Sequence, residues 1–255
     1  MKKSLPFLIC SCLFISITML RAQTEQHFRA SAAAGVNFSQ IEGDAQQGYN
    51  KIGVSVGVKG AYCFKPNFDM SAELLYNSRG GRPNFKAPPP TFSDISPLFK
   101  AELNYADIVL AANFHFKPDN SYTFYRQSLQ IGISYGRLLS SKITINSNRG
   151  DSYNNSLENE LQDAIKQDDI GLLVGYTWNV TSRFGIGVKH VFSLRQIYTN
   201  PRNGLGNPYY ISFIPYNFSL NLVYNLFSPK LNIKSQAEKI RKAKERKKKN
   251  ALEDL

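Results

Sequence analysis

The 255-residue sequence has few of the residues that mark disulfide-rich, metal-binding or catalytic proteins. Of its three cysteines, Cys10 and Cys12 lie in the first segment, which leaves Cys63 without an intramolecular disulfide partner. The chain also has only three histidines, which are His27, His115 and His190. They are far apart in the sequence and show no metal-ligand spacing. We therefore expect no disulfide staple, no metal and no cofactor.

Long apolar runs are also scarce. After residue 22 no run reaches about 18 apolar residues, which excludes a bundle of membrane-spanning helices. Disorder of the whole chain is excluded by the 17 Phe and 14 Tyr residues. The net charge of +12 lies mostly at the two ends, and residues 230–255 alone contain ten basic and four acidic residues. The body between the ends is nearly neutral.

The first segment has the pattern of a secretion signal. Basic Lys2 and Lys3 precede an apolar stretch over residues 5–20, and the small Ala22 offers a cleavage position. A membrane anchor is the alternative, but the stretch is short and polar residues interrupt it. We expect an exported protein whose signal peptide, residues 1–22, is cut after Ala22.

Between residues 28 and 227 apolar residues alternate with small or polar ones. In residues 52–64, for example, Ile52 and Val54 share one face while Gly53 and Ser55 share the other. Side chains alternate across a β-strand, so this period indicates strands with one apolar face. Eight strands are predicted, at residues 28–40, 52–64, 67–78, 100–117, 122–140, 168–179, 182–196 and 209–227.

The connections alternate in length. Those after the second, fourth and sixth strands are short, and the others are long and rich in Gly, Pro and Asn. This alternation is typical of outer-membrane barrels, which have periplasmic turns and external loops. A soluble β-sandwich or lipocalin-like barrel is the alternative, but aromatic residues end the apolar faces, as at membrane interfaces. The predicted fold is all-β, an eight-stranded antiparallel transmembrane outer-membrane β-barrel over residues 23–229.

Several short motifs occur in a characteristic order and spacing. They are Gly35-Val36-Asn37-Phe38-Ser39, Glu73-Leu74-Leu75-Tyr76, Leu103-Asn104-Tyr105-Ala106-Asp107-Ile108, Gly132-Ile133-Ser134-Tyr135-Gly136, Asp169-Ile170-Gly171-Leu172 and Leu222-Val223-Tyr224-Asn225-Leu226-Phe227. With them the chain resembles the PorT-like outer-membrane β-barrel family of Bacteroidetes. The resemblance implies an eight-stranded barrel and, for PorT itself, a part in type IX protein secretion. Two departures are Asp107, where many relatives have Glu, and the chain beyond Phe227.

Strand parity directs five charged side chains into the predicted lumen. These are Lys59, Glu73, Asp107, Lys189 and Arg195. An eight-stranded barrel is just wide enough for its own side chains to fill it, and buried charges must pair. We expect a plug of ion pairs, and a narrow ion or proton path is the alternative. Passage of a sugar or a folded protein is excluded by size.

Nothing in the sequence indicates catalysis. His190 and Ser193 lie close together, but residues three apart on a strand point to opposite faces. A lipid-modifying enzyme would need a cluster of His, Ser and an acid at the rim, and the sequence shows none. We expect a non-enzymatic protein without a small-molecule substrate.

Two of the long loops have features of their own. The loop over residues 78–99 contains the stiff run Pro88-Pro89-Pro90, which either docks a partner or only rigidifies the loop. In residues 156–166, Leu157, Leu161 and Ile165 have helical spacing. We expect a short amphipathic helix there, capped by Ser156 and lying on the barrel rim.

Residues 230–255 form a basic tail, either helical or disordered. Its candidate partner-binding residues are Lys239, Arg241, Lys242, Lys244, Arg246, Lys247, Lys248 and Lys249. An even strand number places both termini in the periplasm, so nucleic acid is not an expected target. Lipid headgroups, peptidoglycan or an acidic face of an envelope protein could bind this positive charge. A solvated tail without a partner is an equal alternative.

The most concrete function follows from the resemblance. It implies a non-enzymatic subunit or accessory factor of protein secretion, with the type IX system as the leading candidate. The alternative is a structural, adhesive or ligand-binding outer-membrane barrel that acts through its external loops. Outer-membrane lipid is a partner in both cases.

Overall fold

A computed structural model describes residues 27–43, 48–83, 98–146, 150–199, 212–229, 233–235, 238 and 241–242. The predicted signal peptide and the proline run at residues 88–90 lie outside the described residues. So does most of the basic tail.

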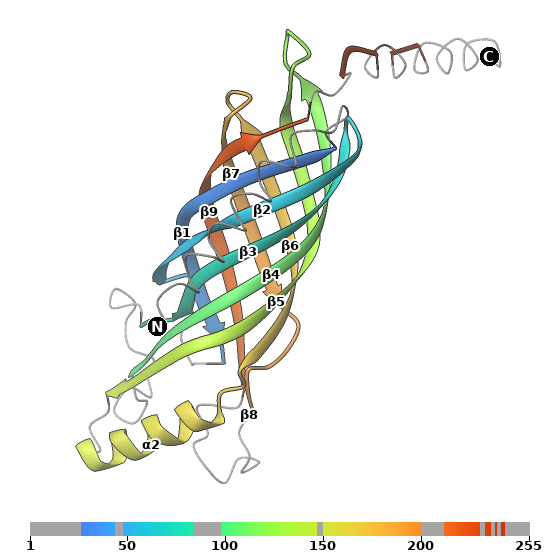
Figure 1. Cartoon of the computed structure of the whole chain (residues 1–255). Helices are drawn as coiled ribbons and strands as arrows, with labels where there is room; N and C mark the ends of the chain where they lie inside the picture. Colours follow the sequence, from blue (N-terminus) through green and yellow to red (C-terminus); the bar gives the residue numbers. More distant parts are fainter. Residues whose placement is uncertain are drawn as a thin grey trace, which may run out of the picture.

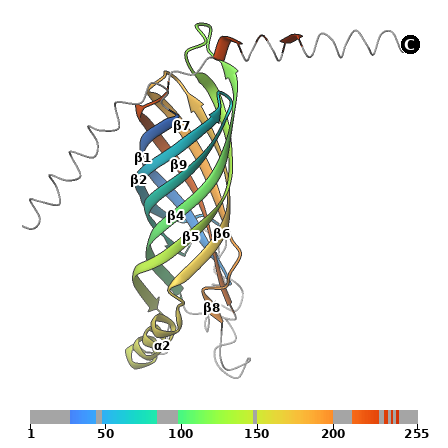
Figure 2. The same cartoon turned by 45° about the vertical axis from the view of Figure 1, so that its right-hand side comes forward.

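The chain folds into a closed antiparallel β-barrel (Figures 1 and 2). Each strand pairs with its neighbour in sequence, except that β7 pairs with β9, and β9 also pairs with β1 to close the ring. The barrel strands are β1 (Phe28–Glu42), β2 (Lys51–Lys65), β3 (Phe68–Gly81), β4 (Leu98–Pro118), β5 (Tyr125–Asn146), β6 (Asp168–Asn179), β7 (Phe184–Ser193) and β9 (Ser212–Phe227). The predicted eight-stranded architecture is confirmed.

The structure departs from the predicted strands at one end of the barrel. Strand β5 continues to Asn146, six residues beyond its predicted end, and a two-residue strand, β8 (Tyr198–Thr199), pairs with the start of β9. We call this the loop end, because the long connections lie here. The opposite end, with the short connections, is the turn end.

The outer surface of the barrel is apolar. On β2, for example, Ile52, Val54, Val56 and Val58 are each at least 50% exposed. Near the turn end an aromatic chain crosses the four strands β1 to β4, and its successive ring centroids are 4.8 to 6.0 Å apart. It consists of Phe28, Tyr62, Phe64, Phe68 and Phe114. Large apolar side chains bordered by aromatic rings are suited to lipid.

Helix α2 (Asp151–Ala164) lies at the loop end (Figure 1). It begins five residues before the predicted start, at an N-cap of Gly150 without a side-chain hydrogen bond, so the prediction that Ser156 caps it is wrong. The helix begins at Asp151, before the apolar residues on which the prediction was based, so Ser156 is an interior residue of the helix. Neither α2 nor any other described helix is long and apolar enough to cross a membrane.

An apolar cluster fills the loop end. Its members are at most 8% exposed and come from the inner face of the barrel, from α2 and from the segment around β8. They are Ile41, Phe99, Ala101, Leu103, Tyr105, Ile143, Ile145, Leu157, Leu161, Ile165, Ile197, Tyr198 and Phe213. We call this set the loop-end core. As predicted, the apolar face of the helix packs on the rim.

Candidate functional site

The barrel lumen changes character along its length, and β4 shows the order. From the turn end its inward residues are His115 and Asn113, then Ala111 and Val109, and then Asp107, followed by the loop-end core. Polar, apolar, charged and again apolar layers therefore follow one another. Because side chains alternate across a strand, one strand contributes to every layer.

The deeper charged layer is centred on Arg79. Its guanidinium contacts Asp107 at 2.8 Å and Asp169 at 3.1 Å, and all three side chains are at most 6% exposed. The same guanidinium lies 4.0 Å from the centroid of the Tyr105 ring. Asn77 donates a 2.5 Å hydrogen bond to Asp107. Removal of any one of these three groups would leave a buried charge without its partner, so the three side chains stabilise one another.

Gly136 makes room for this layer. A β-carbon at this position would lie 2.4 Å from Asp107 Oδ1 and 2.5 Å from Arg79 Nη2. Both distances are far below an ordinary contact. The glycine therefore lets the Arg79 side chain reach its two carboxylates.

The polar layer at the turn end has Glu73 as one of its two acidic centres. Glu73 pairs with Lys189, and its Oε1 lies 3.5 Å from Lys59 Nζ. Gln130 donates a 2.6 Å hydrogen bond to the same carboxylate. Lys59 also donates to Asn113 Oδ1 at 2.9 Å, which links Glu73 to the second centre, Asp69.

Asp69 is held by three neighbours from two strands. Its Oδ2 lies 3.0 Å from Arg29 Nη1 and 2.7 Å from His115 Nε2, while Asn113 donates to Oδ1 at 2.7 Å. On its other side, His115 Nδ1 lies 2.6 Å from Ser128 Oγ. Acid, imidazole and hydroxyl therefore form one hydrogen-bonded chain, in the order seen in Ser-His-Asp hydrolases.

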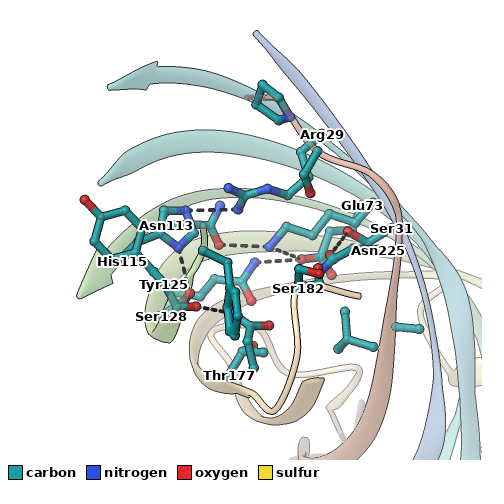
Figure 3. A pocket seen from close by; sticks show the side chains of 18 of the residues that line it. Arg29, Ser31, Glu73, Asn113, His115, Tyr125, Ser128, Thr177, Ser182 and Asn225 are labelled. Carbon is teal, nitrogen blue, oxygen red and sulfur yellow. Dashed lines mark hydrogen bonds and ion pairs between the residues drawn. The ribbon is translucent and has the colours of Figure 1, made fainter. Parts of the chain in front are cut away.

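A cavity of about 100 Å³ lies beside this chain. Figure 3 shows His115, Ser128, Glu73 and Arg29 around it, drawn from several strands. Ser228, Pro229 and Ile233 also line the cavity, and Ile233 is only 2% exposed. These three residues therefore border the turn end of the lumen, where Arg29 and Lys59 stay partly exposed. A second cavity nearer the middle measures only about 10 Å³, close to the space of one water.

The five predicted lumen residues do not form one network in the structure. Lys59, Glu73 and Lys189 meet in one network, whereas Asp107 belongs to the Arg79 layer. The prediction for Arg195 is wrong, since its side chain is exposed. Strand β7 ends at Ser193, so strand parity does not extend to Arg195.

Of the predicted tail residues, only Arg241 and Lys242 are described, and both are helical and exposed. The other six, Lys239, Lys244, Arg246, Lys247, Lys248 and Lys249, lie outside the described residues. A role of the tail in binding stays a prediction.

Sequence reasoning missed the residues that organise both charged layers. Arg79, Asp169, Asp69 and His115 all follow the inward parity of their strands, so the period-two pattern could have selected them. Which of them meet depends on the cross-strand register, and this pattern alone does not give it. The prediction that His190 and Ser193 lie on opposite faces of their strand is confirmed. Ser193 faces inward and contacts Asp169, while His190 faces outward and contacts Tyr49.

Together, the closed barrel and its apolar outer surface define a transmembrane β-barrel protein. A model of the outer membrane protein beta-barrel domain matches residues 21–199. The chain therefore belongs to this family, and outer-membrane lipid surrounds it. The outer-membrane barrel implied by the resemblance is confirmed, and the PorT-like assignment stays a prediction.

Several solved structures are similar to this chain. Ail of Yersinia pestis is 13% identical with a TM-score of 0.42, over 79% of this chain and 100% of that one. Neisserial surface protein A is 14% identical with a TM-score of 0.37, over 79% and 99%. OprG of Pseudomonas aeruginosa is 10% identical with a TM-score of 0.39, over 80% and 98%. No curated protein matches the chain.

Proposed function

We propose that this barrel does not conduct and that its loop end is a rigid platform that binds external ligands. The platform consists of α2 and the ends of β4 and β5. These strands have 21 and 22 residues, whereas a tilted strand needs about 9 to 11 to cross a bilayer. A large part of this hairpin is therefore available beyond the membrane.

The single observation that carries the proposal is the loop-end core. Leu157 and Leu161 of α2 are buried against barrel residues, and Glu158 accepts a 2.6 Å hydrogen bond from the N–H of Ile145. Lys166 N–H donates to the Ile197 carbonyl at 2.7 Å, which joins the chain after α2 to the segment before β8. A barrel that only spans a membrane has no need of this ordered cap, which fixes α2 in place and closes the lumen.

The helix of the platform is acidic. Helix α2 carries Asp151, Glu158, Glu160 and Asp163 and has no basic residue. Asp151 and Asp163 are exposed. Charge complementarity favours a partner with a basic surface, so a basic extracellular protein is the proposed ligand class.

The test compares the wild-type chain in lipid nanodiscs with the triple variant Asp151→Asn, Glu160→Gln and Asp163→Asn. Lysozyme immobilised on a sensor surface serves as a basic protein probe. We expect the affinity of the triple variant for lysozyme to be lower by a factor of about ten or more. Glu42→Gln, an exposed acid on β1 outside the platform, is the matched control and should bind like the wild type. Equal binding by the triple variant and the wild type would contradict the proposal.

The secretion role implied by the resemblance is the second candidate. It is supported by the basic residues Arg241 and Lys242, which follow the turn end and are exposed. Quantitative mass spectrometry of the medium and cell surface of a strain lacking the gene tests it. A broad loss of exported proteins with precursors retained in the periplasm would favour this role, and an unchanged secretome would count against it.

A further inference from the structure

We propose that Ser128 and His115, positioned by Asp69, form a catalytic centre in the turn-end cavity that hydrolyses short-chain carboxylic esters. This activity is separate from the platform at the loop end, because the two sites lie at opposite ends of the lumen.

Three adjacent strands bring the groups together. His115 on β4 lies directly opposite Ser128 on β5. Asp69 on β3 lies opposite Asn113, which is two residues from His115 on the same inward face. The resulting distances are 2.6 Å from Ser128 Oγ to His115 Nδ1 and 2.7 Å from His115 Nε2 to Asp69 Oδ2. Both are within reach for proton transfer.

The neighbours of Asp69 assign the roles of the two ring nitrogens. A carboxylate only accepts, so His115 Nε2 carries the proton and donates it to Asp69 Oδ2. Arg29 Nη1 lies 3.0 Å from the same Oδ2 and 3.2 Å from His115 Nε2. A protonated Nε2 offers no lone pair, so Arg29 donates to the Asp69 carboxylate. Nδ1 is then the basic nitrogen, and it accepts the hydroxyl proton of Ser128. Compared with the chymotrypsin arrangement the two nitrogens exchange roles, which leaves the proton transfer itself unchanged.

The nucleophile has space beside it. Ser128 and His115 both line the cavity, and the Tyr125 ring stacks on His115 with centroids 6.0 Å apart. Lys59 and Lys189 line the same cavity. Their positive charges would stabilise the oxyanion that forms when a hydroxyl adds to a carbonyl.

The volume of the cavity selects the substrate class. About 100 Å³ holds several waters, which is room for an acetyl-sized acyl group but not for a fatty acyl chain. The expected substrates are therefore small esters that enter from the turn end.

The reaction needs only the ester and water. Ser128 Oγ attacks the carbonyl carbon while its proton passes to His115 Nδ1, and the leaving alcohol takes that proton as the ester C–O bond breaks. A water then attacks the acyl-serine and gives a proton to Nδ1. Collapse of this second intermediate releases the carboxylic acid and returns the proton to Ser128 Oγ. Asp69 acts through His115 as a positioning residue.

The experiment uses the folded full chain in detergent micelles. It measures p-nitrophenyl acetate hydrolysis and covalent labelling by methanesulfonyl fluoride, whose sulfonyl group is about the size of an acetyl group, with the labelled residue found by peptide mass spectrometry. We expect label on Ser128, no label and only background hydrolysis in Ser128→Ala, and a rate at least about 100-fold lower in His115→Gln. In Asp69→Asn the acidic limb of the pH–rate profile should move to lower pH, because the imidazolium loses its carboxylate partner.

Ser134→Ala is the matched control, because Ser134 is also buried and inward on β5. It should keep both the label and the rate, and folding of each variant is checked by its heat-modifiable mobility in gel electrophoresis. Wild-type protein that is folded yet unlabelled at Ser128 would overturn the proposal. So would Ser128→Ala with undiminished hydrolysis.

Discussion

The two ends of the lumen are built on the same strands but filled in opposite ways. At the loop end large side chains such as Phe99, Leu103 and Tyr105 occupy the inward positions and leave no exposed surface. At the turn end the inward positions of the same strands hold shorter polar residues such as Ser71, Asn113 and Ser128, and a cavity is present beside them. The interior width of an eight-stranded barrel is nearly fixed. Side-chain volume therefore decides which end is closed and which can hold a small molecule.

The two charged layers differ in the same way. Arg79, Asp107 and Asp169 are almost fully buried, whereas the side chains of Lys59 and Arg29 are 24% and 19% exposed in the turn-end network. The first layer stabilises the barrel, and the second borders a cavity.

Replacing Arg79 should destabilise the protein most. In Arg79→Met, Asp107 and Asp169 would be buried without their cation, and breaking a buried pair costs about 3 to 5 kcal/mol. Urea unfolding in lipid vesicles measures the loss. Arg137→Met, which removes an exposed partner of Asp168, should change the free energy of unfolding far less. Similar losses in the two variants would contradict the distinction.

The loop-end core should be sensitive to lost volume. Leu161 is 1% exposed, and Leu161→Ala should cost about 2 to 5 kcal/mol in the local opening of α2. Hydrogen exchange of the α2 amides measures this opening. Asn155→Ala, at an exposed position of the same helix, is the control and should leave the exchange nearly unchanged. Fast exchange of α2 in the wild type would show that the platform is not rigid.

A β-carbon at Gly136 should disturb the Arg79 layer. Gly136→Ala places it 2.4 Å from Asp107 Oδ1, and overpacking of this kind costs about 1 to 3 kcal/mol. The matched control is Gly60→Ala, where a β-carbon meets nothing within 4 Å. Equal stability of the two variants would argue against a tightly packed layer.

The smallest expected effect concerns the turn that follows β4. Asp119 accepts hydrogen bonds from the backbone N–H groups of Ser121, Thr123 and Phe124 at 3.1, 2.6 and 3.1 Å. Burial raises the pKa of Asp119, but the backbone hydrogen bonds outweigh it and hold the pKa below its usual value. A lowered pKa means that this contribution is present near neutral pH and is lost as the pH falls through the folded-state pKa.

Asp119→Ala should therefore cost about 0.5 to 2 kcal/mol at pH 7, by analogy with a lost helix cap. The difference from the wild type should vanish once Asp119 is protonated. Unfolding titrations of both proteins between pH 7 and pH 3 check this sign. A difference that grows on acidification would contradict it.

Much of the fold could be predicted from the sequence, because strand periodicity and loop length are local properties. Strand parity alone places Glu73 and Asp107 in the lumen. Parity does not hold for Arg195, because β7 ends at Ser193, where it makes its last pairing with Gly171 of β6. It also gave no sign of the Asp69–His115–Ser128 chain. These residues are up to 59 positions apart in sequence and meet only through the register of three strands.

We infer that the loop-end core closes the lumen, so that the polar cavity is reached only from the turn end. Ion conductance of the purified full chain in planar lipid bilayers tests it most directly. A closed lumen predicts no conductance steps above the bilayer background at either polarity. Stable, reproducible open-channel steps from the folded wild-type barrel would contradict it and would make the lumen a pore.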